Sequence, residues 1–300
     1  MRFSECLVLI ILIATVNGFF HTMFLARSTT HFIDNGDCRN PDNSTKFAII
    51  VHGWRQTCEE KYILKLTTNL ETFRGDCVIC MNFGVVGATK YFGLVRNVDV
   101  LAEILLEKLL DLERLGFDPS NGYMYGFSYG ARIVILAGIL YGQRLAEIDV
   151  CDMAGPLFDK FPILDSKAAA KNVQCIHTSS SKGTWARDCH QNWNMGYCGK
   201  YQIAEETNNE NAGSHGLCNI FYNAAFHHNF YAEEVPSQCN VGYIKPYWPN
   251  KFKMGYNERR KHKVRGELFA STWRNYPYSK ARKIRRRFFF SFNNFRNMFV

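Results

Sequence analysis

Residues 126–130 read Gly-Phe-Ser-Tyr-Gly, which places a serine between two glycines. A serine hydroxyl can attack an ester carbonyl when a neighbouring base accepts its proton. An apolar run precedes this motif and another follows it, as in a nucleophile elbow, where flanking glycines permit a strained turn between a strand and a helix. The alternative is a glycine-rich turn with an incidental serine. We expect Ser128 to be the nucleophile of an acyl-transfer reaction.

A serine nucleophile needs a base, and an acid that orients the base. In folds built around a nucleophile elbow, the acid follows the serine in the chain and the histidine comes last. Asp152 stands at the end of the next predicted strand, before Met-Ala-Gly-Pro, so its carboxylate is expected at the same sheet edge as Ser128. Asp149 lies inside that strand, and Asp159 and Asp165 lie beyond it. We expect Asp152 to be the acid.

Nine histidines compete for the role of the base. The chain order excludes the histidines before the serine. Among the later ones, His177 lies in a predicted strand, His190 lies beside a cysteine among polar residues, and His262 lies in the basic end of the chain. His227 and His228 follow an apolar run and are interpreted as the solvated end of a helix. His215 opens the same run from a loop, Gly-Ser-His-Gly, which suits a base that must reach across to Ser128. We expect His215 to be the base.

Acyl transfer also requires backbone N–H groups that stabilise the oxyanion of the tetrahedral intermediate, each contributing about 3 kcal/mol. The residue after the nucleophile, Tyr129, is expected to supply one of them. The other is expected from a loop after an early strand. The sequence Val-His-Gly-Trp closes the first predicted strand with a glycine that lets the backbone approach a ligand, so the Trp54 N–H is the candidate. The alternative for His52 and Gly53 is an ordinary strand-ending turn.

The elements that would position these residues alternate along the chain. Continuous apolar runs predict strands buried on both faces of a parallel sheet, and apolar residues at steps of three and four predict amphipathic helices. The expected strands span residues 46–51, 78–83, 122–126, 147–151 and 173–178, and the expected helices span 59–73, 98–112 and 131–141. This alternation is typical of a doubly wound α/β domain, with a mostly parallel central sheet flanked by helices.

The N-terminus is interpreted as a signal peptide. Arg2 precedes a short apolar run, residues 7–16, and the small residues Val16 and Gly18 suit a signal peptidase. The alternative is a membrane anchor, but the run is shorter than the roughly 20 residues that span a bilayer. We expect residues 1–18 to be removed, residues 19–278 to form a single catalytic domain, and the protein to be secreted and extracellular.

Secretion changes the interpretation of the cysteines. Without Cys6 the chain keeps ten, an even number that predicts up to five disulfides in an oxidising compartment. Cys77 and Cys80 have the spacing of a redox or zinc half-site, but residues three apart in a strand face opposite sides, so we interpret both as structural. No metal-ligand spacing stands out, and ester hydrolysis by a serine needs no metal, so we expect no cofactor. Asn43 begins an Asn-Ser-Thr glycosylation sequon.

The formal net charge of +9 is concentrated at the C-terminal end. Residues 251–300 carry 15 Lys and Arg against two Glu, so the rest of the chain is mildly acidic. Residues 279–300 combine Lys and Arg with six Phe and contain no acidic residue. This basic aromatic tail suits an anionic membrane surface or a heparin-like polyanion. Nucleic acid would be attracted by the same charge without specificity. The alternative is a disordered or processed extension.

Together these motifs resemble the animal lipase family that includes pancreatic lipases, secreted phospholipases A1 and insect lipase-like proteins. Four landmarks occur in the family order between residues 40 and 278: His-Gly-Trp at 52–54, Gly-Phe-Ser-Tyr-Gly at 126–130, Asp-Met-Ala-Gly-Pro at 152–156 and Gly-Ser-His at 213–215. The resemblance implies an α/β-hydrolase fold with Ser128 as nucleophile, Asp152 as acid and His215 as base. It also implies that Trp54 and Tyr129 are the oxyanion donors.

The chain departs from the family pattern beside these landmarks. The family usually has His before the nucleophile and Leu after it, Pro after the acid, and Cys two residues before the histidine; here these positions hold Phe127, Tyr129, Met153 and Gly213. The missing cysteine implies that a disulfide near the histidine is absent or moved.

The segment before His215 bears on the substrate. Triacylglycerol lipases of the family resemble one another in a long amphipathic lid before this histidine, and phospholipases A1 in a short one. Residues 199–212 are short and polar, so the resemblance implies a phospholipase A1 with a lipid substrate. One alternative is a triacylglycerol lipase or general carboxylesterase. Another is a non-catalytic lipid-binding or storage protein on the same scaffold, as insect yolk proteins resemble lipases.

Overall fold

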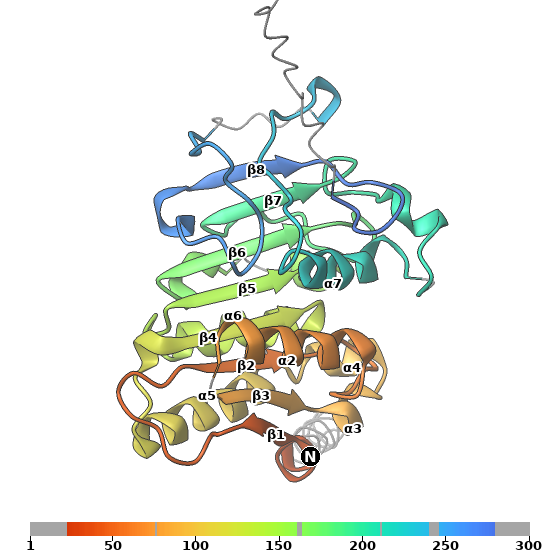
Figure 1. The fold of residues 1–300 in the computed structure, drawn as a ribbon. Coiled ribbons are helices and arrows are strands. Elements are labelled where there is room, and N and C mark those ends of the chain that lie inside the picture. Colours follow the sequence, from red (N-terminus) through yellow and green to blue (C-terminus); the bar gives the residue numbers. More distant parts are fainter. Residues whose placement is uncertain (1–22, 76, 161–163, 211, 240–245, 280–300) are drawn as a thin grey trace, which may run out of the picture.

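The structure, a computed structural model, describes residues 23–75, 77–160, 164–210, 212–239 and 246–279 of the 300-residue chain. In this part, eight strands form a sheet with the order β1-β3-β2-β4-β5-β6-β7-β8 (Figure 1). Each strand runs parallel to its neighbours, except β1, which is antiparallel to β3. The strands are β1 (His31–Gly36), β2 (Phe47–Val51), β3 (Cys77–Asn82), β4 (Gly122–Phe127), β5 (Glu147–Cys151), β6 (Asn172–His177), β7 (Gln191–Met195) and β8 (Gly266–Ala270).

Helices cover both faces of the sheet, which confirms the expected α/β fold (Figure 1). The helices are α2 (Lys61–Phe73), α3 (Gly84–Gly87), α4 (Tyr91–Val95), α5 (Val98–Leu115), α6 (Tyr129–Leu140) and α7 (Ser214–Ala224). Helices α5 and α6 pack into one hydrophobic cluster, and α2 and α7 into a second on the other face. Strand β2 contributes residues to both clusters, Ile49 to the first and Ile50 to the second, because successive strand residues point to opposite faces.

Three strands of the sheet were not expected from the sequence. Strand β1 lies at the edge and is mostly exposed, so it lacks an apolar pattern. Strand β7, Gln-Asn-Trp-Asn-Met, is fully buried although three of its residues are polar. Its amide side chains find partners elsewhere in the fold; the Gln191 amide, for example, donates to the backbone carbonyls of Lys261 and Val264. Strand β8 extends the sheet from the basic C-terminal region.

Five disulfides form among the described residues, which is the number that the ten cysteines allow. They join Cys38 to Cys77, Cys58 to Cys80, Cys151 to Cys218, Cys175 to Cys189 and Cys198 to Cys239. Cys77 and Cys80 are structural and belong to opposite faces of the sheet, as expected.

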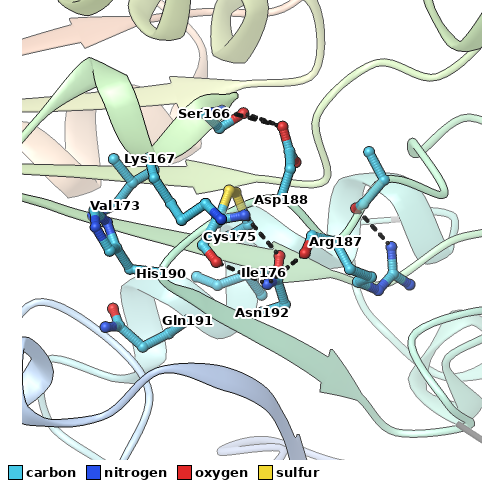
Figure 2. Close-up of a disulfide and its surroundings, with 12 residues drawn as sticks. Ser166, Lys167, Val173, Cys175, Ile176, Arg187, Asp188, His190, Gln191 and Asn192 are labelled. Atoms are coloured by element: carbon cyan, nitrogen blue, oxygen red, sulfur yellow. Dashed lines mark hydrogen bonds between the residues drawn. A yellow bond between two sulfur atoms is a disulfide. The ribbon is translucent and has the colours of Figure 1, made fainter. Parts of the chain in front are cut away.

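The Cys175–Cys189 disulfide attaches the loop before β7 to strand β6 (Figure 2). Side chains around it hold the same loop: the Asn192 amide donates to the carbonyls of Arg187 and Cys189, and the Ser166 hydroxyl donates to Asp188 at 2.7 Å. This end of the sheet is therefore cross-linked both covalently and by hydrogen bonds.

The predicted signal peptide, residues 1–18, and all of the predicted tail except Ser279 lie outside the described residues. Among the helices that the structure describes, none combines the length and apolar character needed to cross a membrane. Asn43, the glycosylation candidate, is exposed just before β2, and its backbone carbonyl accepts a hydrogen bond from the Asn121 amide.

Candidate active site

Ser128 occupies the turn between β4 and α6, with a φ of 55° and a ψ of −116°. A positive φ strains a residue with a side chain, and this strain is expected at a nucleophile elbow. The flanking glycines allow the helix to start so close to the sheet. A Cβ atom on Gly126 would lie 2.7 Å from Ala131 Cα, and one on Gly130 would lie 2.3 Å from the carbonyl oxygen of His52.

The fold brings Ser128, His215 and Asp152 together from β4, α7 and β5. His215 Nε2 lies 2.8 Å from the Ser128 hydroxyl oxygen, and Nδ1 lies 2.6 Å from Asp152 Oδ2. Strands β4 and β5 are parallel neighbours that pair Phe127 with Cys151, so the next residues of both strands emerge at the same edge. The imidazole therefore lies between a hydroxyl that it can deprotonate and a carboxylate that orients it.

His215 belongs to the first turn of α7, and the expectation that it lies in a loop is wrong. Glu205 contacts the first residue of this helix. The Glu205 carboxylate accepts a hydrogen bond of 2.8 Å from the Ser214 N–H and another from the Ser214 hydroxyl. An anion at a helix N-terminus satisfies free N–H groups and interacts favourably with the helix dipole.

The carboxylate of Asp152 is fully buried and is held by the segment after β6. Its Oδ1 accepts hydrogen bonds from the backbone N–H groups of Thr178, at 2.7 Å, and Ser179, at 3.1 Å. Its Oδ2 accepts a third from the Ser179 hydroxyl at 2.6 Å. Neither residue was predicted to belong to the site, although both follow a strand that neighbours β5 and so emerge at the same sheet edge.

Of the other histidines considered as the base, His262 is exposed and the remaining four make contacts elsewhere. His177 is buried between Arg187, at 3.1 Å, and Asn192. His190 Nδ1 accepts a hydrogen bond from a backbone N–H, and burial together with nearby Arg265 lowers its pKa to about 4. His227 contacts Asn69, and His228 contacts Tyr276.

Trp54, one predicted oxyanion donor, lies beside Ser128 and lines the same cavity. Its indole N–H donates to the Thr89 carbonyl at 3.0 Å. His52, two residues earlier, donates its Nδ1–H to the Gly53 carbonyl at 2.9 Å. The His52 ring stacks on Phe83 and accepts a hydrogen bond from the Phe83 N–H at 3.3 Å. Burial lowers the pKa of His52 to about 4, so this imidazole is neutral at physiological pH.

Tyr129, the other predicted donor, opens helix α6, where the first N–H groups have no partner within the helix. Its buried hydroxyl donates to the Leu94 carbonyl at 2.7 Å and so attaches α4 to α6. Neither the Trp54 nor the Tyr129 backbone N–H has a hydrogen-bond partner among the described residues, which leaves both available to an oxyanion.

A cavity of about 530 Å³ opens over the serine. Its walls combine the serine and histidine with aromatic residues and one charged side chain: Trp54, Gln56, Tyr91, Phe127, Ser128, Ala154, Pro156, Lys182, Gly213, His215 and Gly216. The described residues contain no cluster of acidic, His and Cys side chains that could hold a metal ion. Lys182 brings a cation to this cavity.

Besides Tyr129, which opens α6, three residues depart from the family pattern beside the landmarks. The Phe127 ring lies 4.7 Å from the His215 ring, Met153 is buried, and Gly213 is the residue before α7. Gly213 stands where the family usually has a cysteine. Helix α7 is instead attached through Cys218 to Cys151, the residue before Asp152.

Residues before His215 form a short segment that is attached to its surroundings. It contains the 3-10 turn Ile203–Glu206, in which Glu205 caps α7 and Glu206 pairs with Arg274 at 3.0 Å. The Thr207 hydroxyl donates to the Arg274 carbonyl.

The sheet is mostly parallel, a strained serine follows β4, and Asp152, His215 and Ser128 contact one another in that order at the sheet edge. These features define the class of the α/β-hydrolases. The chain belongs to the Lipase family, because the sequence model of this family matches residues 25–194, more than half of the chain. The matched part includes Ser128 and Asp152, and His215 lies beyond it.

Curated relatives include two kinds of lipid hydrolase. The chain is 31% identical over 144 residues to "Phospholipase A1 member A" of Pongo abelii, which is 44% of this chain and 30% of the relative. It is 28% identical over 143 residues to "Pancreatic triacylglycerol lipase" of Sus scrofa, 47% of this chain and 31% of the relative. These alignments span about a third of each relative's length. Among solved structures, it is similar to a phospholipase/carboxylesterase from Dyadobacter fermentans, with 14% identity, a TM-score of 0.37, and coverage of 49% of this chain and 71% of that one.

Proposed function

We propose that this protein is a secreted serine carboxylic-ester hydrolase that acts on lipids, and specifically a phospholipase A1. The observation that carries the proposal is the unbroken series of contacts from Ser128 through His215 to Asp152 at the wall of a cavity. Two backbone N–H groups beside Ser128 support an oxyanion hole, and the family supports ester hydrolysis.

The proposed reaction proceeds through an acyl-enzyme. The Ser128 oxygen attacks the ester carbonyl carbon while His215 Nε2 accepts the hydroxyl proton. Asp152 stabilises the imidazolium, and the N–H groups of Trp54 and Tyr129 stabilise the oxyanion. The carbon–oxygen bond to the glycerol then breaks, and the departing alkoxide takes the proton from Nε2. A water molecule attacks the acyl-enzyme with His215 again as base, which releases the fatty acid and restores Ser128.

Two features support a phospholipid over a neutral acylglycerol. Lys182 is the charged residue among those that line the cavity, and a lysine ammonium is a suitable partner for a phosphate. The short segment before His215 is polar and attached to the rest of the fold, with no long amphipathic helix among its described residues. The similarity to a triacylglycerol lipase keeps neutral-lipid hydrolysis as the second candidate.

The test is acyl release by the purified protein and its Ser128→Ala variant. The substrates are a phosphatidylcholine with different chains at its two ester positions and, separately, a triacylglycerol. Release of the first-position chain that disappears in Ser128→Ala supports phospholipase A1 activity. Cleavage of triacylglycerol alone supports the second candidate. If neither lipid is cleaved and a fluorophosphonate fails to label Ser128, the non-catalytic lipid-binding alternative replaces both.

The cellular context is also proposed. Five disulfides in the described residues support folding in an oxidising, extracellular compartment. We propose cleavage after residue 18, a catalytic domain over residues 19–278, glycosylation at Asn43, and attraction of the tail, residues 279–300, to anionic membranes or heparin-like polyanions. Mass spectrometry of the secreted protein tests the first and third of these. Binding of a chain that ends at Tyr278 to phosphatidylserine vesicles and to heparin tests the last.

A further inference from the structure

We propose that Ser179 is a positioning residue of this site, whose hydroxyl fixes the Asp152 carboxylate in the orientation that His215 requires. The inference rests on the proposed function of Ser128, His215 and Asp152. Ser179 lies just beyond the C-terminal end of β6, two residues after His177, and the residue is 4% exposed.

The contacts of the Asp152 carboxylate show what the hydroxyl does. Asp152 Oδ2 accepts the Ser179 hydroxyl and lies at the same distance, 2.6 Å, from His215 Nδ1. Among the described residues, His215 and Ser179 are the two whose side chains hydrogen-bond this carboxylate, and the other donors are backbone N–H groups. Because the carboxylate is fully buried, its orientation depends on protein donors.

The direction of the Ser179 hydroxyl is set by its own neighbour. The Gly183 N–H donates to the Ser179 oxygen at 3.2 Å, which leaves the hydroxyl hydrogen to point at Asp152. Gly183 also permits the loop to close over the acid, because a Cβ atom there would lie 2.6 Å from Asp152 Oδ1. The loop therefore presents one oriented donor to the oxygen that faces the base.

Removal of this hydroxyl has two separable consequences. The carboxylate loses a donor and can rotate about its Cβ–Cγ bond, so the imidazole is less well directed at Ser128. The negative charge of Oδ2 is also less neutralised, so it favours the protonated, inactive form of the base more strongly. We therefore expect a lower kcat and an acid limb of the pH–rate profile that moves to higher pH.

The experiment compares Ser179→Ala and Ser179→Cys with the wild type. The thiol nearly preserves the volume of the side chain but is a weak donor. Ser180→Ala is the matched control, because it makes the same chemical change in the next residue, whose side chain is exposed. Two rates are measured across pH and normalised to folded protein: hydrolysis of a short-chain ester, and labelling of Ser128 by a fluorophosphonate.

We expect Ser179→Ala to lower kcat about 10- to 100-fold, the effect of a lost hydrogen bond to a charged group, with KM unchanged. Ser179→Cys is expected to lie between Ser179→Ala and the wild type, and Ser180→Ala to match the wild type. A purely structural role predicts instead that Ser179→Cys equals the wild type and that the pH profile stays in place. If Ser179→Ala fails to fold, Ser179→Cys alone carries the comparison.

The decisive measurement repeats Ser179→Ala in an Asp152→Asn background. If Ser179 acts through the carboxylate, its loss changes kcat little there, since the carboxylate is already absent. Equal losses in both backgrounds would overturn the inference. A wild-type protein that neither hydrolyses esters nor is labelled overturns the proposed function and this inference with it. An active wild type with an unaffected Ser179→Ala variant overturns the positioning role alone.

Discussion

A disulfide joins Cys151, the residue before Asp152, to Cys218, three residues after His215. It links the strand that carries the proposed acid to the helix that carries the proposed base, across 67 residues of sequence. The distance between Asp152 and His215 is thus constrained by a covalent bond as well as by their hydrogen bond.

Replacement of both cysteines by alanine is expected to lower the free energy of unfolding by about 2–5 kcal/mol and also to lower kcat per folded molecule. The control is Cys38→Ala with Cys77→Ala, which removes the disulfide between the segment after β1 and strand β3. That variant is expected to lose stability but to keep kcat. Urea unfolding and ester hydrolysis measure the two effects, and equal kcat losses in both variants would contradict the positional role of Cys151–Cys218.

Lys182 provides a test of substrate choice. If its ammonium binds the phosphate, Lys182→Met is expected to lower kcat/KM for phosphatidylcholine about tenfold and to leave a short neutral ester unaffected, because one charge-assisted contact is lost. Lys200→Met, an exposed lysine near the same loop, is the control. An equal loss of kcat/KM on both substrates would show that Lys182 supports the site but does not bind the phosphate of the headgroup.

Stability is expected to fall in mild acid because two imidazoles are held neutral. Their pKa of about 4 in the fold compares with 6.5 in the unfolded chain, for both His52 and His190. Between these values the unfolded state binds more protons, so the free energy of unfolding decreases as pH falls from 6.5 to 4. Protonation of His52 alone is expected to lower the free energy of unfolding by about 3 kcal/mol across this pH range.

The measurement is the thermal midpoint across this pH window for the wild type and a His52→Asn, His190→Asn variant. The variant is expected to show a shallower decline, whatever its midpoint at neutral pH. The same slope in both proteins would assign acid sensitivity to other groups.

A buried ion pair holds the C-terminal part of the chain to the sheet. Lys261 lies 3.2 Å from Asp149 and 2.8 Å from Glu147, and the Tyr222 hydroxyl donates to Asp149 at 2.6 Å. Burial favours the neutral amine, but Asp149 and Glu147 outweigh it, so the pKa of Lys261 is raised.

Lys261→Met is expected to lower the free energy of unfolding by about 3–5 kcal/mol, because it leaves the buried Asp149 charge without its partner. Adding Asp149→Asn is expected to recover most of the loss, while Lys263→Met, an exposed neighbour, serves as the control. Urea unfolding measures all three. A double variant as unstable as Lys261→Met would mean that packing, and not charge, causes the effect.

Much of the fold and site could be predicted because the signals are local. Strands such as β2 and β4 are buried on both faces, so they are continuous apolar runs. The serine turn needs glycines at both sides, and the chain order of serine, acid and histidine is a general rule for folds with this turn, so it narrows the candidates to residues such as Asp152 and His215. The strand patterns and the serine turn depend on a few neighbouring residues, which is why the sequence alone indicated the α/β class and the candidate side chains.

Only the tertiary structure decided the hydrogen-bond partners of polar side chains and the pairing of the cysteines. Strand β7 is polar, and its burial is possible because Gln191 and its neighbours meet acceptors and donors from distant segments. The Cys151–Cys218 pairing and the Ser179 hydroxyl on Asp152 join residues 67 and 27 positions apart, and the Glu205 contact at the start of α7 spans nine. Hydrogen bonds and disulfides require specific distances and directions, and composition and periodicity carry no information about these until the chain has folded.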